Sequence, residues 1–160
     1  MKQGENKAGS GQNPEDSFGF EIEQRFQSTC CNKVRYNRQK ELYLYAPVPV
    51  DPNVPEGTEV ALEACLEAFF TDELVEDVVC HCGKKSTQIL RKRFIDYPKT
   101  LVVIPKRMVY VDWVPKKLQV EITSDLGSVL DVEKYVGNNC ELQPGEQTFE
   151  EPDEIEPEFD

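Results

Sequence analysis

The chain has 160 residues, of which 18 are Lys or Arg and 30 are Asp or Glu, giving a formal net charge of −12. A chain of this length buries about two thirds of its unfolded surface, which favours one domain with one core. Because basic residues are few and no apolar run approaches the ~20 residues that cross a bilayer, we expect no nucleic acid and no membrane as partners, and a cytoplasmic or nuclear location.

The two ends of the chain differ in composition from its middle. Residues 1–16 are rich in Gly, Asn and Ser without periodicity, which predicts a flexible segment. Nine acidic residues and no Lys or Arg lie in residues 141–160, so the rest of the chain has 21 acidic against 18 basic side chains, a net charge of −3. Such an acidic end with few apolar residues predicts a disordered linker. Residues 17–140 remain as the folded domain.

The first strands are predicted from alternation of apolar and polar side chains. Residues 18–22 alternate with the period of a strand that buries one face. Residues 33–45 are rich in aromatic and β-branched side chains and predict its antiparallel partner. The side chains expected to point inward are Val34, Tyr36, Leu42 and Leu44. Four prolines between residues 47 and 55 then predict an extended connector.

A short helix is predicted after the connector. Thr58 is its predicted N-cap, because a side-chain hydroxyl can accept a backbone N–H of the first turn. The apolar stripe has the i, i+3, i+4, i+7 spacing of an amphipathic helix and consists of Leu62, Cys65, Leu66 and Phe69. On this stripe Cys65 is expected to be a small buried hydrophobe and not a nucleophile.

The rest of the chain predicts further strands. Their expected ranges are residues 78–80, 86–94, 100–104, 108–111 and 118–122. Gly83 predicts a tight turn between the first two. Residues 101–104 are apolar on both faces, which predicts a central strand of the core sheet. Together these segments predict an α+β fold that is rich in antiparallel strands.

Four of the six cysteines form two groups, Cys30-Cys31 and Cys80-His81-Cys82. Two pairs of thiolates are a common ligand set for a structural zinc (Zn) ion. Adjacent side chains of a strand point to opposite faces, so only one of Cys30 and Cys31 would face a metal unless the chain turns there. This spacing favours a degenerate finger of free thiols over an intact zinc site.

Cysteine catalysis is not predicted for this chain. His81 is the only histidine, and a nucleophilic thiol needs a base within hydrogen-bond reach. Side chains of neighbouring residues on a strand diverge, so Cys80 or Cys82 with His81 would make a poor dyad. We therefore assign no catalytic residue. Disulfides are not expected either, since the first residues lack the apolar run of a secretion signal.

Several segments, in order, resemble the catalytic domain of ubiquitin-specific proteases. They are the helix sequence ALEACLEAFF (residues 61–70), the cysteine hairpin (80–85), the basic strand (91–94) and the block at 97–107. More narrowly, four segments are similar to the isopeptidase T branch: residues 31–36, 46–49, 111–118 and 142–146. The run DWVPKKL is the most specific of them. The similarity covers residues 13–146.

The resemblance implies the antiparallel fingers and part of the palm of a papain-like cysteine hydrolase. That family cleaves isopeptide bonds between ubiquitin units, and this branch acts on unanchored polyubiquitin. The nucleophile box and the histidine box of the family are not in the matched region, so we expect an internal fragment that is inactive alone. Its implied partners are ubiquitin, polyubiquitin and the remainder of the protease domain. The two cysteine groups take the place of the zinc-binding fingers, so zinc is the one cofactor implied.

The resemblance also places residues 110–113 near a loop that borders the ubiquitin tail. Tyr110, Asp112 and Trp113 are therefore candidate ubiquitin contacts, with the acidic Asp112 suited to the arginines of that tail. Alternatively, Trp113 packs into the core with Tyr110. Two other functions stay open: a non-catalytic ubiquitin-binding module, and a small zinc module that binds protein or RNA.

Overall fold

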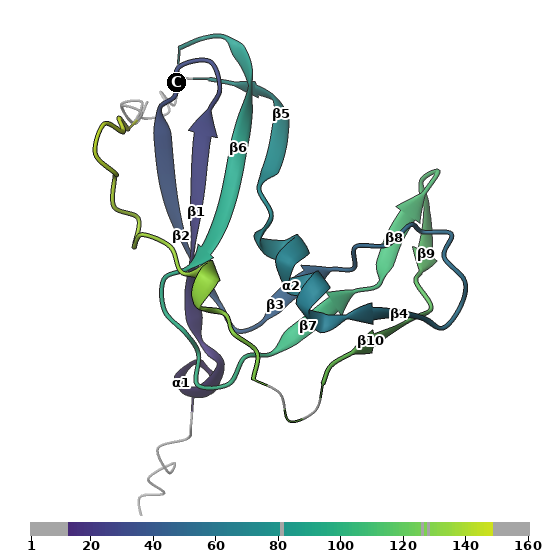
Figure 1. Cartoon of the computed structure of the whole chain (residues 1–160). Helices are drawn as coiled ribbons and strands as arrows, with labels where there is room; N and C mark the ends of the chain where they lie inside the picture. The colour runs from purple at the N-terminus through teal and green to yellow at the C-terminus, as the bar shows by residue number, and fades with distance from the viewer. Residues whose placement is uncertain (1–12, 81, 126, 128, 149–160) are drawn as a thin grey trace, which may run out of the picture.

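The computed structural model describes residues 13–80, 82–125, 127 and 129–148. These residues contain ten strands, two α-helices and one 3-10 helix, and most strand pairs are antiparallel (Figure 1). The predicted β-rich α+β class is confirmed. Within the described ranges no helix combines the length and the apolar character that a membrane span requires.

A four-stranded antiparallel sheet forms one arm of the fold (Figure 1). Its order is β2-β1-β6-β5, and its strands are β1 (Phe20–Ser28), β2 (Val34–Glu41), β5 (Glu73–Val79) and β6 (Lys85–Phe94). The β1–β2 pairing is the one predicted from sequence. Phe20 and Ile22 bury the face toward the core, as their alternation predicts, and Ile22 lies opposite Phe94 of β6.

The other arm consists of three two-stranded sheets around helix α2 (Leu62–Phe70). Two of these sheets are parallel and one is an antiparallel hairpin. The pairs are β3 (Leu44–Pro47) with β7 (Val103–Lys106), β4 (Thr58–Ala61) with β10 (Val120–Thr123), and β8 (Met108–Val111) with β9 (Val114–Lys117). The hairpin β8–β9 projects away from the four-stranded sheet (Figure 1).

Two predicted strands differ from the structure. The single strand expected over residues 33–45 is divided, because the chain bends at Leu42 and Tyr43 and brings Leu44 into the core as part of β3. Residues 101–104 are not a central strand. Strand β7 begins at Val103 and pairs with β3, and its apolar side chain Ile104 stays 38% exposed. The centre of the large sheet is instead β1 and β6.

The predicted helix begins later than expected, and Thr58 is not its N-cap. Thr58 opens strand β4, and its hydroxyl donates a hydrogen bond to the carbonyl of Pro55 at 2.6 Å. Helix α2 follows Ala61 without a side-chain cap. Its stability therefore comes from burial of its apolar face and not from capping.

Part of the N-terminal segment that was predicted to be flexible forms a short helix before the first strand. Residues 1–12 lie outside the described residues. From Pro14 the chain forms the short helix α1 (Pro14–Phe18), and the Asn13 side chain accepts a hydrogen bond from the Glu15 N–H at 3.2 Å. Proline at the first helical position and an Asn cap are the ordinary N-terminal signals of a helix.

Helix α2 packs between two clusters of buried side chains. The first contains Phe20, Ile22, Leu44, Leu66, Phe70, Phe94 and Tyr135, and the second contains Ala46, Val48, Val60, Cys65, Leu118 and Val120. Phe70 stacks on Tyr135 with ring centroids 4.2 Å apart. Cys65 is fully buried, which raises the pKa of its thiol, and its predicted role as a small buried hydrophobe is confirmed.

Residues 133–148, which we call the C-terminal strap, run beside the four-stranded sheet (Figure 1). The strap begins with the 3-10 helix η1 (Glu133–Tyr135) and ends where the Val34 N–H donates to the Gln147 carbonyl at 2.8 Å. Glu146 forms an ion pair with Arg25. The stretch predicted as a disordered linker is thus attached to the sheet as far as residue 148, and residues 149–160 lie outside the described residues.

Buried Glu23 holds the middle of the strap. Its carboxylate accepts the backbone N–H groups of Asn138 at 2.6 Å and Cys140 at 2.8 Å. Glycine is required at position 137, because a Cβ there would lie 1.5 Å from a Glu23 carboxylate oxygen. A charged group this buried is tolerated because backbone donors satisfy it.

Leu66→Ala tests the role of α2 as the core of the fold. Leu66 is 1% exposed, so we expect this variant to lower the free energy of unfolding by about 2–5 kcal/mol, measured by urea denaturation. The matched control is Leu74→Ala on β5, where the side chain is 63% exposed and the expected change is within about 0.5 kcal/mol. An equal decrease in the free energy of unfolding in the two variants would show that burial of α2 does not stabilise the core.

Candidate functional site

Four cysteines meet at the far end of the four-stranded sheet. Cys30 and Cys31 lie in the turn that connects β1 to β2, and Cys80 and Cys82 lie in the connection from β5 to β6. Their four sulfur atoms all lie within 4.8 Å of one another. We call this group the fingertip cluster.

Cys30 and Cys31 can face one site because they lie in a turn and not on a strand, which is the exception that the sequence left open. The β1–β2 connection closes with the Asn32 N–H donating to the Ser28 carbonyl at 3.0 Å, and Asn32 has a φ of 57°. In the opposite turn Gly83 has a φ of 85°, and its N–H donates to the Cys80 carbonyl at 2.8 Å. Two tight turns therefore point all four thiols toward one place.

The donor set of the fingertip cluster fits a zinc ion. The Sγ atoms of Cys30 and Cys82 are 3.3 Å apart, and those of Cys31 and Cys80 are 3.5 Å apart. Four thiolates at the usual Zn–S distance of about 2.3 Å in a tetrahedron have sulfurs about 3.8 Å apart. The observed spacing needs only small side-chain adjustments to reach this arrangement, so the four cysteines could bind zinc.

Hydrogen bonds favour the thiolate form of two of these cysteines. The backbone N–H of Cys82 and then the Ser28 hydroxyl lower the pKa of the Cys80 thiol to about 6. Ser28 also lowers the pKa of Cys30. The Lys84 backbone acts to lower the pKa of Cys82, but the hydrogen bonds shared with Cys30 and Cys80 outweigh it and raise that pKa. Thiolates are the form that binds metal.

Ser28 is a residue of this site that the sequence did not indicate. It is fully buried, and its hydroxyl lies 3.1 Å from Cys30 Sγ and donates to Cys80 Sγ at 3.4 Å. A hydroxyl that forms hydrogen bonds with metal-binding sulfur atoms orients those ligands. Its position two residues before Cys30 was the only sequence signal. His81 lies outside the described residues, so the absence of a cysteine–histidine dyad stays a prediction.

The hairpin β8–β9 presents the predicted ubiquitin contacts to solvent. Trp113 is 95% exposed and Tyr110 is 74% exposed, so the alternative that they pack together into the core is wrong. Asp112 and Trp113 form the two-residue turn, with φ values of 49° and 66°. The left-handed region costs an ordinary residue about 1–2 kcal/mol, so an exposed tryptophan there is an uncommon choice for a turn. Strain of this type often marks a binding residue.

A concave surface lies between the two arms of the fold. A cavity of about 480 Å³ and a smaller one of about 140 Å³ share Tyr45, Phe69 and Lys92 in their linings. The Lys92 ammonium lies 4.9 Å from the centre of the Phe69 ring, and Lys106 lies 6.0 Å from that of Tyr45. Phe69 was predicted on the buried stripe of α2, but it is only partly buried because it faces this surface.

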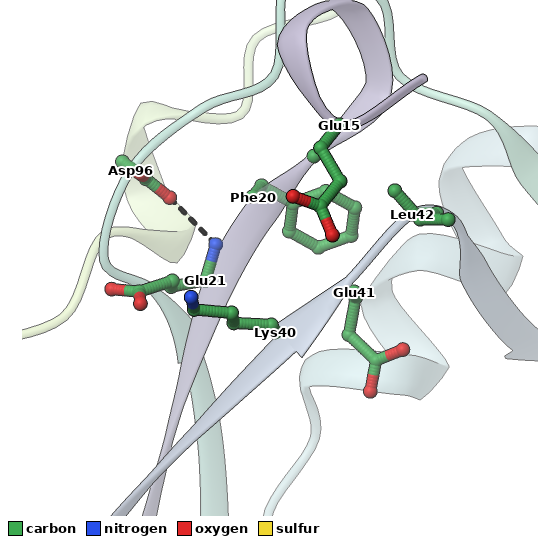
Figure 2. A pocket seen from close by; sticks show the side chains of 8 residues that line it. Glu15, Phe20, Glu21, Lys40, Glu41, Leu42 and Asp96 are labelled. Atoms are coloured by element: carbon green, nitrogen blue, oxygen red, sulfur yellow. Dashed lines mark hydrogen bonds between the residues drawn. The ribbon is translucent and has the colours of Figure 1, made fainter. Parts of the chain in front are cut away.

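A separate cavity of about 460 Å³ lies at the base of β1, near helix α1 (Figure 2). Its lining includes Glu15, Phe20, Glu41 and Leu42, and in the view of Figure 2 the Glu15 side chain is drawn in front of the Phe20 ring. The Glu21 N–H donates to the Asp96 carboxylate at 2.6 Å. The described residues that line this cavity include no thiol or imidazole.

Curated relatives match most of this chain. Ubiquitin carboxyl-terminal hydrolase 5 of Homo sapiens is 30% identical over an alignment of 164 positions, which covers 86% of this chain and 19% of the relative. Ubiquitin carboxyl-terminal hydrolase 13 of Homo sapiens is 32% identical over an alignment of 168 positions, which covers 89% of this chain and 19% of the relative. The chain spans about a fifth of the length of these relatives. No protein-family model matches it.

A solved structure shares the fold. It is the structure of the SAGA Ubp8/Sgf11/Sus1/Sgf73 DUB module bound to ubiquitin aldehyde, with a TM-score of 0.57 and 21% identity, covering 76% of this chain and 26% of that chain. The mostly antiparallel strands and few helices are consistent with a fingers and palm portion of that fold. The relatives and this neighbour together support a ubiquitin-specific protease domain of the isopeptidase T type, as the sequence predicted.

Proposed function

We propose that this chain, as part of a ubiquitin-specific protease domain, forms the fingers and part of the palm of a deubiquitinating cysteine hydrolase. The substrates would be the isopeptide bonds between ubiquitin units of unanchored polyubiquitin. The observation that carries the proposal is the similarity to ubiquitin carboxyl-terminal hydrolase 5, which extends over 86% of the chain. Ubiquitin, polyubiquitin and the remainder of the protease domain are the proposed partners. The cytoplasmic or nuclear location stays a prediction.

The concave surface between the arms would receive the body of ubiquitin. Its centre is aromatic and basic, with Tyr45, Phe69 and Lys92 shared by two neighbouring cavities. Acidic Asp72 and Glu73 lie on the rim of the larger cavity. Aromatic side chains are enriched at the centre of protein interfaces and polar groups at the rim, so Tyr45 and Phe69 fit such a centre, while Lys92 adds a positive charge to it.

The hairpin β8–β9 would contact the tail of ubiquitin. Trp113 and Tyr110 supply exposed aromatic surface, and the Asp112 carboxylate between them suits an arginine side chain. Tryptophan and tyrosine carry a large share of the free energy at protein interfaces. A contact role agrees with the exposure of these two side chains, whereas packing in the core does not.

The fingertip cluster would hold one structural zinc ion. Cys30, Cys31, Cys80 and Cys82 would supply four thiolates, and Ser28 would orient two of them. Bound zinc would join the turn after β1 to the connection after β5 and so close the end of the sheet. This ion would have no place in the hydrolysis, because structural zinc sites have all four positions taken by protein ligands.

Two other functions rest on narrower observations. A non-catalytic ubiquitin-binding module would use the same hairpin and concave surface without any hydrolysis. A small zinc module that binds protein or RNA would use only the fingertip cluster. Neither accounts for the similarity that extends through α2 and the hairpin, so the deubiquitinase part is the function we favour.

Zinc binding can be measured directly. We expect one zinc ion per chain by elemental analysis, and none in the double variant Cys31→Ser, Cys80→Ser. Removing the ion with a chelator should lower the free energy of unfolding by several kcal/mol, since structural zinc contributes about 10–16 kcal/mol of apparent binding free energy in finger peptides. Cys140→Ser, a cysteine outside the cluster, should keep the ion. A zinc-free wild-type chain of unchanged stability after zinc addition would refute this part.

The chain alone should not cleave ubiquitin chains. We assign no nucleophile–base pair to it, so incubation with diubiquitin should give no monoubiquitin by gel analysis, with an active deubiquitinase as the positive control. Cleavage that is lost in a Cys80→Ser or a Cys82→Ser variant would show that this chain carries its own catalytic thiol, and would overturn the assignment.

Ubiquitin binding should depend on the hairpin. Titration of the chain into isotope-labelled ubiquitin should shift NMR signals of the ubiquitin tail, and Trp113→Ala should weaken the Kd about 30-fold, the effect of losing a hot spot worth about 2 kcal/mol. Val129→Ala, at another highly exposed apolar position, is the control and should leave the Kd unchanged. Absence of any shift at high protein concentration would exclude binding by this chain.

A further inference from the structure

We propose that the fingertip cluster is also a reversible redox lock, in which a peroxide joins Cys30 to Cys82 by a disulfide that links the two turns. The disulfide itself needs only the thiols. Its effect on a bound metal rests on the proposed zinc site.

The geometry favours pairing between the turns. Cys30 and Cys82 come from different turns, and their sulfur atoms are 3.3 Å apart; Cys31 and Cys80, also from different turns, are 3.5 Å apart. A disulfide has a sulfur–sulfur bond of about 2.0 Å, so each contact can close with a movement of about 1.5 Å or less shared by two side chains. No rearrangement of the sheet is needed.

Exposure determines which pair reacts first. Cys30 and Cys82 are exposed, whereas Cys80 is buried and Cys31 is intermediate. We call Cys30 and Cys82 the outer pair, and Cys31 and Cys80 the inner pair. A peroxide in solution therefore reaches the outer pair before the inner pair. Ser28, which contacts Cys30 and Cys80, is itself fully buried, whereas Cys30 and Cys82 stay exposed to solvent.

The chemistry balances with hydrogen peroxide as the oxidant. One thiol of the outer pair attacks a peroxide oxygen, which breaks the O–O bond, forms a sulfenic acid and releases water. The second thiol attacks the sulfenic sulfur, forms the S–S bond and releases a second water. Two thiols are oxidised by two electrons and one peroxide is reduced. A dithiol reductant reverses the step by thiol–disulfide exchange.

The lock and a metal ion exclude one another at the fingertip cluster. A sulfur in a disulfide is not a thiolate, so closing the outer pair removes two of the four ligands and would release a bound zinc ion. The fingertip would then be held by a covalent link in place of the metal. Either state joins the same two turns, so oxidation changes the chemistry of this end of the sheet without opening it.

The experiment treats the full chain with hydrogen peroxide, in its zinc-loaded and its chelator-treated forms. The products are alkylated, digested and analysed by mass spectrometry under non-reducing conditions, with zinc release followed by a chromophoric chelator. We expect a cross-linked peptide pair that has lost two hydrogens, assigned by fragmentation to Cys30 and Cys82 and reversed by dithiothreitol. In the zinc-loaded form its appearance should parallel the release of zinc.

Variants separate the possible outcomes. The double variant Cys31→Ser, Cys80→Ser should still form the link, and Cys82→Ser should lose the Cys30–Cys82 peptide; circular dichroism before oxidation checks that each is folded. Disulfides within one turn, or sulfinic acid at Cys30 without a link, would overturn the proposal. A link that forms in a chain that binds no zinc would support the lock and refute the zinc site, so the two proposals fail separately.

Discussion

The position of helix α2 between two buried clusters is the constraint on which the rest of the structure depends. Leu66 and Phe70 contact the cluster beneath the four-stranded sheet, and Cys65 on the same helix contacts the cluster beneath the parallel strand pairs. Arg93 of β6 reinforces the joint by donating to the Phe70 carbonyl at 2.7 Å. Because one short helix supplies side chains to both clusters, it sets how the four-stranded sheet is placed relative to β3 and β7 around the concave surface between the two arms.

Sequence patterns predicted elements well where one face of an element is buried. The alternation around Phe20 and Ile22 and the stripe of α2 both reflect a single core contact, so local periodicity was sufficient. Periodicity predicted the wrong element where contacts between distant parts of the chain determine the local structure. Residues 101–104 have the apolar sequence of a central strand, yet only Leu101 and Val103 contact the core. Strand β7, which contains Val103 and Ile104, pairs in parallel with β3, more than 50 residues earlier in the sequence. Thr58 has a capping side chain, but pairing with β10 places it in a strand.

The candidate site was also predicted only in part from the sequence. The four cysteines were identified from their grouping, but the geometry assumed for Cys30 and Cys31 was that of a strand, whereas Asn32 with its positive φ places them in a turn. The exposure of Trp113 depends on a two-residue hairpin turn in which Asp112 is a usual turn residue, but Trp113 stands where glycine is usual, so the turn signal in the sequence is incomplete. The strap was missed for a related reason: its acidic composition predicts disorder, while the buried carboxylate that holds it belongs to Glu23, far earlier in the chain.

Trp113 is the only tryptophan of the chain, and its indole lies in solvent at the end of a hairpin. Intrinsic emission from this side chain therefore reports the environment of the hairpin and is nearly blind to the two cores. Loss of the folded state would leave the indole as hydrated as before, so a flat fluorescence trace during denaturation would not mean that the protein had resisted unfolding. A blue shift at constant temperature would instead signal that a second molecule has covered the turn.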